Sequence, residues 1–225
     1  GGMLPLHILE EMLTAGEEQG IYSSLFWVEG RTGEVEDVVQ TLQNFSDHAC
    51  FISCPPHLIS DELAKAVRKA QNIAVVLPYT SATYKKCRGA AQILVENKCL
   101  FGTSISYDSN SLSYILDPSL QKQLSILQGS FACFELKGDL GPVSEANLKE
   151  FLAQARSSRG ASIFLLDLRM DLKERAENIG PGSKYFVIDH QGNVRQAWEN
   201  TTLPGVNIKS HSLPRIAQAM AIQPH

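Results

Sequence analysis

The sequence lacks a hydrophobic run of the roughly 20 residues that a membrane-spanning helix needs. It also lacks a block of basic residues, and its formal net charge is −4. The first absence argues against a membrane span, and the second argues against a nucleic-acid partner. Gly1 and Gly2 precede Met3 as the remnant of a tag would. The segment after Met3 is interrupted by proline and by charged residues, so we expect no signal peptide.

Cysteine is scarce and unevenly spaced: the five are Cys50, Cys54, Cys87, Cys99 and Cys133. An odd number of cysteines, mostly within apolar stretches, is typical of reduced thiols, so the sequence predicts a cytoplasmic protein. Cys50 and Cys54, with His48 and His57 nearby, could bind a metal ion. Their spacing departs from the usual Cys-x2-Cys of zinc sites, however, and a strand would turn both thiols toward one face. We therefore predict no metal and no cofactor.

What the sequence does contain is the composition of a folded core, with 44% hydrophobic and 20% charged residues over 225 positions. Short apolar runs alternate with segments of helical periodicity. This alternation predicts an α/β protein with a largely parallel sheet flanked by helices. The expected strands are 21–28, 49–54, 73–77, 99–107, 131–136, 163–168 and 185–188.

The stretch around the last two of these strands organises the rest of the prediction. Two apolar runs, Ile163–Leu168 and Tyr185–Ile188, flank the charged segment Asp171–Asn178, which has a helical composition. This order predicts a β-α-β unit with parallel strands, which places Asp167 and Asp189 at strand ends. The turn-forming residues after Ile188 also predict a hairpin with the segment 194–198.

An internal repeat is suggested by two Gly-x-x-Gly turns, because Gly30 and Gly33 are both 108 positions before Gly138 and Gly141 (138 − 30 = 141 − 33 = 108). After an N-terminal helix within 1–20, the chain would form two similar β-α-β-α-β halves, 21–128 and 129–225. One continuous domain is the alternative. A true repeat requires the same strand order in 21–78 and 129–189.

The two glycines of the first turn are candidate ligand-binding residues. Gly30 and Gly33 lie between a predicted strand and a predicted helix, where backbone amides could bind a phosphate. The pattern is neither a dinucleotide-binding glycine motif nor a Walker loop. The alternative is that both glycines serve the geometry of the turn alone.

Four side chains are candidate catalytic residues. Asp167, Asp189 and His190 are predicted at the carboxyl ends of parallel strands, where open α/β sheets bind ligands, and an aspartate beside a histidine could orient a general base. Cys54 could act as a nucleophile. The alternatives are a hairpin turn for Asp189 and His190, a cap or ion pair for Asp167, and simple packing for Cys54.

The segment from Ser144 to Arg169, which ends in Asp167-Leu168-Arg169, resembles the stretch that precedes the catalytic machinery of inositol-phosphatase-like cysteine phosphatases. That activity needs an arginine six positions after the catalytic cysteine. None of the five cysteines has one. The resemblance therefore implies no phosphatase activity for this chain.

With no complete catalytic constellation, the sequence favours a non-catalytic cytosolic binding or adaptor protein that acts through protein–protein contacts. The alternative is a small-molecule hydrolase or transferase with its site at the strand carboxyl ends. A flat apolar patch would favour the adaptor, and a concave pocket lined with polar groups would favour the enzyme. The identity of the partner or substrate and the oligomeric state stay open.

Overall fold

The computed structural model describes residues 4–28, 30–137, 140–157, 163–167, 186–189, 191–196, 202–212, 215 and 216. Six strands form a parallel sheet in which the spatial order follows the chain order, β1-β2-β3-β4-β5-β6. Their bounds are β1 Ser23–Trp27, β2 Ala49–Ser53, β3 Ile73–Pro78, β4 Phe101–Tyr107, β5 Phe131–Leu136 and β6 Phe164–Asp167. The predicted α/β class with a largely parallel sheet is confirmed.

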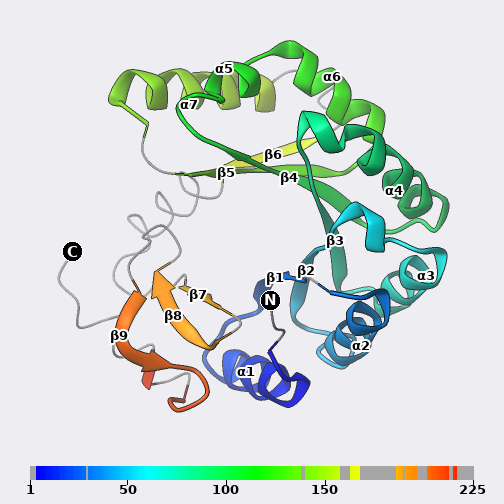
Figure 1. Cartoon of the computed structure of the whole chain (residues 1–225), viewed down its shortest axis with the longest axis vertical. Helices are drawn as coiled ribbons and strands as arrows, with labels where there is room; N and C mark the ends of the chain where they lie inside the picture. The colour runs from blue at the N-terminus through cyan, green and yellow to red at the C-terminus, as the bar shows by residue number, and fades with distance from the viewer. Residues whose placement is uncertain are drawn as a thin grey trace.

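Helices occupy every connection between neighbouring strands of this sheet. They are α2 Thr32–Leu42, η1 Pro56–Leu58, α3 Asp61–Ala70, η2 Ser81–Thr83, α4 Tyr84–Glu96, α5 Leu112–Ile115, α6 Pro118–Leu127 and α7 Pro142–Ser157, and α1 Leu6–Glu18 precedes β1. Crossovers between parallel strands are right-handed, so consecutive connections place all their helices on one side. The sheet therefore curls into a half-barrel with its helices on the convex side (Figure 1). No described helix has the length and apolarity to cross a bilayer.

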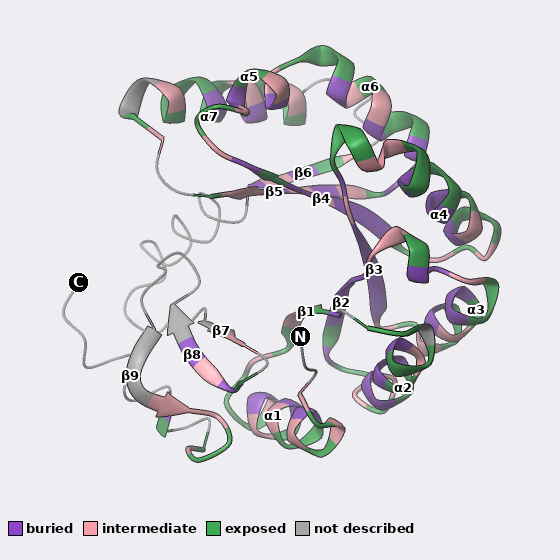
Figure 2. Cartoon of the chain, viewed as in Figure 1, coloured by how far each residue is buried: buried purple, intermediate pink, exposed green. Residues whose placement is uncertain are grey.

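The hydrophobic core lies between the convex face of the sheet and these helices. Alternate strand positions, such as Leu77, Ile105 and Phe134, are almost fully buried there. The helices show the matching pattern, with buried residues toward the sheet and exposed residues toward solvent (Figure 2). Local hydrogen bonds set several helix boundaries: Ser60 Oγ accepts a hydrogen bond from the Leu63 amide at 3.1 Å and caps α3.

A second, smaller sheet is antiparallel. It contains β7 Phe186–Ile188, β8 Asn193–Gln196 and β9 Thr202–Asn207 in that order. In Figure 1 it lies on the open side of the half-barrel. The predicted hairpin between β7 and β8 is confirmed. The predicted parallel pairing of 163–168 with 185–188 is wrong, because an apolar run does not specify which strand it pairs with.

The strand β9 includes Leu203–Gly205, whose Leu-Pro-Gly sequence is typical of a loop. Proline and glycine argue against a central strand, but β9 pairs only with β8 and lies at an edge of the sheet, where proline is tolerated. Ser212 precedes a sequence typical of a helix start, and in the segment after it the structure describes only Arg215 and Ile216, which are helical.

The internal repeat is wrong at the level of strand order. In the first half, β1, β2 and β3 are neighbours in one parallel sheet, whereas β5 and β6 are followed by β7 in a different, antiparallel sheet. Moreover, β4 and β5 lie on either side of residue 128 and pair from Gly102–Phe131 to Tyr107–Leu136. One sheet therefore runs across the proposed boundary.

Candidate functional site

The concave face of the half-barrel carries aromatic side chains on four of its strands. They are Trp27, Phe51, Phe131 and Phe164, which occupy the positions between those that pack on the helices. The rings of Phe51 and Phe131 meet edge to face, with centroids 5.8 Å apart. Trp27 is 52% exposed and Phe164 is 62% exposed. The concave face therefore has an apolar surface that no other described residue covers.

Gly102 makes the contact between two of these rings possible. A Cβ atom at this position would lie 2.4 Å from both the ring and the carbonyl oxygen of Phe131. Gly102 is the direct neighbour of Phe131 in the sheet. Its lack of a side chain lets the Phe131 ring lie across β4 toward Phe51.

A polar cluster of Ser106, Glu135 and Lys137 lies at the carboxyl end of the same face. Ser106 Oγ donates a hydrogen bond to Glu135 Oε2 at 3.2 Å, and Lys137 Nζ lies 2.5 Å from Glu135 Oε1. Ser106 and Glu135 are direct neighbours in the sheet, and Ser104 and Cys133 form the neighbouring pair two positions earlier. The cluster is solvent-accessible and offers a carboxylate acceptor, an ammonium donor and a hydroxyl within one small area.

The predicted site residue Asp167 takes a different position. It ends β6 as expected, but it is fully buried and shares its face with Phe134 and Leu165, which belong to the core. Tyr107 donates a hydrogen bond from its hydroxyl to Asp167 Oδ2 at 2.6 Å. Asp167 therefore does not lie on the concave face. Its hydrogen bond with Tyr107 joins the end of β6 to the end of β4.

Cys54 is also turned into the core. It is 1% exposed, and its Sγ lies 3.8 Å from the Pro55 carbonyl oxygen. Burial raises the pKa of the Cys54 thiol to about 12, which leaves almost none of the nucleophilic thiolate at neutral pH. Its neighbour Cys50 is buried as well, and no group of three metal-ligating side chains occurs among the described residues.

Asp189 has the geometry of a turn residue. Its Oδ1 accepts hydrogen bonds from the amides of Gln191 and Asn193 at 2.8 and 2.9 Å, and these bonds close the β7–β8 hairpin. Gly192 within this turn has a φ of +90°. His190 falls outside the described residues, so its catalytic role stays a prediction.

At the turn formed by Gly30 and Gly33, the Glu34 carboxylate lies where a bound phosphate would be expected. Gly30 has a φ of +143°, and the amide of Arg31 donates to Glu34 Oε2 at 3.0 Å. A Cβ at Gly30 would lie 2.1 Å from that same oxygen. Glu34 thus occupies the anion position at the start of α2, and Gly33 faces open space. Phosphate binding at Gly30 and Gly33 stays a prediction that this geometry does not favour.

The polar cluster was missed because its residues are far apart in the sequence and resemble no motif. A signal was present, since polar side chains fall on alternate positions at the ends of two expected strands, Ser104 and Ser106 on one, Glu135 and Lys137 on the other. Alternate positions share one face of a sheet. Only the pairing of β4 with β5 shows that the two polar sets meet.

Comparisons with known proteins place the fold. No protein-family model and no curated protein sequence matches the chain. The structure is similar to SuiB of Streptococcus suis bound to S-adenosylmethionine, with a TM-score of 0.67 and 13% identity over 94% of this chain and 58% of SuiB. It is also similar to anSMEcpe with bound S-adenosylmethionine and the Kp18Cys peptide, with a TM-score of 0.62 and 16% identity over 95% of this chain and 72% of that chain. The chain thus spans less than two thirds of the length of SuiB.

These neighbours overturn the interpretation of the chain as a non-catalytic adaptor that works through protein–protein interaction. Both were solved with a bound small molecule, S-adenosylmethionine, on the same fold. The finding fits the alternative interpretation better, namely a small-molecule hydrolase or transferase with its site at the strand carboxyl ends. The sequence favours an adaptor only because it lacks a recognisable catalytic motif, and the absence of a motif is weak evidence about a fold whose sites are assembled from several strands.

Proposed function

We propose that the chain is an enzyme that binds S-adenosylmethionine, or a closely related nucleoside, on the concave face at the carboxyl ends of β4 and β5. The observation that carries the proposal is the similarity over 94% of the chain to SuiB, whose structure contains S-adenosylmethionine. The position follows from a general rule, since parallel α/β sheets bind ligands beyond the carboxyl ends of their strands. The bound nucleoside would supply carbon activated by a sulfonium.

The polar cluster fits such a ligand in its chemistry. The Glu135 carboxylate can accept hydrogen bonds from the two ribose hydroxyls, and the Lys137 ammonium can bind the carboxylate of the methionine part. Ser106 holds Glu135 in place through its hydrogen bond of 3.2 Å. The aromatic side chains of the concave face offer surfaces on which an adenine could stack. A ligand with both ionic and aromatic parts would therefore find both kinds of partner on one face.

The test is calorimetric titration of the full chain with S-adenosylmethionine, in wild type and in Glu135→Gln. We expect saturable binding by the wild type and a Kd about tenfold or more higher for Glu135→Gln, because a hydrogen bond to a charged group contributes about 1.5–3 kcal/mol. A ligand at 100 times its Kd should also raise the free energy of unfolding by about 2.7 kcal/mol.

Glu145→Gln is the matched control. Glu145 also pairs with a lysine, because its Oε1 lies 3.2 Å from Lys149 Nζ, but this pair lies on the outer helix α7. This variant should bind like the wild type. Absence of saturable binding by the wild type would reject the ligand, and equal weakening in both variants would reject the site.

A peptide is the second partner that we propose. The structure of anSMEcpe contains the Kp18Cys peptide beside S-adenosylmethionine. Exposed Trp27 and Phe164 on the concave face of this chain provide apolar surface of the kind that binds peptide side chains. Fluorescence of Trp27, followed during titration with a cysteine-containing peptide and compared with Trp27→Phe, tests the peptide contact.

A cytoplasmic location is proposed on separate grounds, since all five cysteines are free thiols.

A further inference from the structure

The strands β1 and β6 are the two outer strands of the half-barrel, and their open edges differ. At β6, the carbonyl oxygen of Leu165 accepts a hydrogen bond from Arg156 Nε on α7 at 2.8 Å, which covers part of that edge. At β1, no described residue makes a comparable contact. Natural proteins usually cover or charge such edges, because an uncovered strand edge pairs readily with another chain. The open edge of β1 is therefore a candidate docking surface for an extended segment.

The backbone groups on this edge come from alternate residues of β1. The amide of Val28 and the carbonyl oxygen of Tyr22 form hydrogen bonds with β2 and its flanking residues. Neighbouring residues of a strand direct their backbone groups to opposite sides, so the residues between these positions alternate between β2 and the open edge. The outward groups are those of Ser23, Leu25 and Trp27, and no hydrogen bond within the described part of the chain reaches them. They offer the row of amide donors and carbonyl acceptors that an added strand needs.

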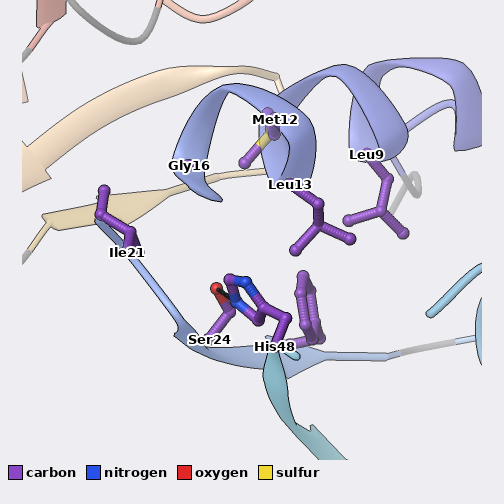
Figure 3. Close-up of a pocket in the computed structure, with 8 residues that line it drawn as sticks. Leu9, Met12, Leu13, Gly16, Ile21, Ser24 and His48 are labelled. Carbon is purple, nitrogen blue, oxygen red and sulfur yellow. Dashed lines mark hydrogen bonds between the residues drawn. The ribbon is translucent and has the colours of Figure 1, made fainter. Parts of the chain in front are cut away.

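The helix α1 packs on the convex face of β1. Leu13 of α1 points toward Ser24 and His48 (Figure 3). Ser24 lies on the opposite face of the strand from the outward residues Ser23 and Trp27. Both of these residues are exposed, so the edge stays accessible while α1 holds the strand from behind.

The helices before and after β1 in the chain are strongly acidic. Residues 1–48, which include α1, β1 and α2, contain nine acidic residues and one basic residue, Arg31. The exposed carboxylates that the structure describes there belong to Glu10, Glu11, Glu18, Glu34, Asp37 and Asp47. No ion pair within the described part of the chain involves them. This side of the molecule therefore attracts a positively charged partner and repels an acidic one.

We propose that the free edge of β1 binds a lysine- or arginine-rich segment of the peptide partner, in extended form, as an added strand. The inference rests on the proposed function, because it specifies the kind of peptide that the enzyme takes. Backbone hydrogen bonds to Ser23, Leu25 and Trp27 give affinity for an extended chain. The carboxylates of α1 and α2 select basic side chains. The rings of Tyr22 and Trp27, each 52% exposed, do the same, since an aromatic face attracts a cation.

The test uses a fluorescein-labelled heptapeptide of alternating lysine and valine with blocked ends. Fluorescence anisotropy follows its binding to the full chain. We expect saturable binding of one peptide per chain, and a Kd about tenfold or more higher at about 0.5 M than at about 0.05 M NaCl, because salt screens exposed charges. The same peptide with glutamate in place of lysine should not bind.

Two methylated peptides test the backbone contact with the wild-type protein. One carries N-methyl groups on its lysine amides, and the other carries them on its valine amides. Alternate amides of an extended peptide face opposite sides, so only one of the two sets faces β1. One methylated peptide should therefore bind about tenfold or more weakly than the other.

Ser23 provides matched variants in the protein. Ser23→Pro removes one outward amide, and proline is tolerated at the first residue of an edge strand. It should weaken binding about threefold to tenfold, because one backbone hydrogen bond is lost, whereas Ser23→Ala keeps the amide and should bind like the wild type. Glu18→Gln, at the end of α1, should weaken binding about twofold to fivefold, and Glu62→Gln on α3 should leave it unchanged. Circular dichroism checks that each variant is folded.

Equal binding of the two methylated peptides, or of the lysine and glutamate peptides, would overturn the proposal. So would a dimer of the chain that Ser23→Pro dissociates and that binds no peptide, since the edge would then belong to a second copy. Titration with S-adenosylmethionine tests the proposed function separately. Edge-dependent peptide binding without nucleoside binding would reject only the nucleoside site, and the reverse result would reject only the peptide edge.

Discussion

At the scale of single residues, Asn72, which directly precedes β3, joins the end of α2 and the turn that follows it. Its Nδ2 lies within hydrogen-bond distance of the carbonyl oxygens of Leu42, Phe45 and His48, at 3.0, 2.8 and 3.1 Å. These carbonyls belong to the end of α2 and the turn that leads into β2. One side-chain amide thus adds a donor to three backbone acceptors outside the sheet ladder and ties the start of β3 to the turn before β2.

We expect Asn72→Ala to lower the free energy of unfolding by about 1–3 kcal/mol, because it removes the amide donor that the carbonyl oxygens of Leu42, Phe45 and His48 share. The measurement is urea denaturation followed by circular dichroism. Asn44→Ala, at an exposed position in the same turn, is the control and should change the free energy by less than about 0.5 kcal/mol. Similar losses in the two variants would show that Asn72 does not hold the turn.

At the scale of elements, the contact between β4 and β5 determines the shape of the concave face. Gly102 faces Phe131 directly, and the ring of Phe131 lies over the position that a side chain would occupy. Two positions further along β4, Ser104 pairs with Cys133, and the polar pair Ser106–Glu135 follows. The aromatic surface and the polar cluster therefore depend on one register between two strands.

Gly102→Ala should destabilise the protein by about 3 kcal/mol or more, since the new Cβ would overlap the Phe131 carbonyl oxygen, which cannot rotate away as a side chain could. Gly33→Ala, in the first turn of α2 and facing open space, should be neutral or stabilising by up to about 1 kcal/mol. Thermal unfolding of both variants provides the comparison. A Gly102→Ala protein as stable as the wild type would mean that β5 can move away from β4 at little cost.

At the scale of the whole molecule, the buried thiols link stability to pH. Burial raises the pKa of Cys50, with a smaller contribution from Glu17, and burial alone raises the pKa of Cys54, to about 12 in each case from an ordinary value of 9.0. Folding therefore favours the protonated thiols. Their contribution to stability is complete below pH 9 and is lost as the pH rises from 9 toward 12.

The free energy of unfolding should accordingly fall above pH 9, with a slope that approaches about 1.4 kcal/mol per pH unit for each of these two thiols. Urea denaturation under reducing conditions at pH 7, 9 and 10 measures this slope. Cys54→Ala should remove about one thiol's share of it. An unchanged slope in that variant would indicate that Cys54 is less buried in solution than its 1% exposure implies.

The sequence alone determined the class of the fold and most of its elements. When one side of a helix or strand is buried, apolar residues recur along the sequence with the period of that element. Apolar runs and helical stripes therefore identified the strands and helices of the half-barrel within a few residues. The turn at Asp189 was also predictable, because its hydrogen bonds join residues two to four positions apart.

Only the tertiary structure decided which strands are neighbours and which side chains meet as a result. The apolar run at 185–188 looked like the partner of β6 and is instead the first strand of an antiparallel sheet. Ser106 and Glu135 are 29 positions apart and form a site only because β4 and β5 pair in one register. Asp167 shows the reverse, since its place at a strand end was predictable but its burial against Tyr107 was not. The partner of each strand, and the surroundings of each side chain, depend on contacts between distant segments of the chain. Such contacts leave no periodic pattern in the sequence.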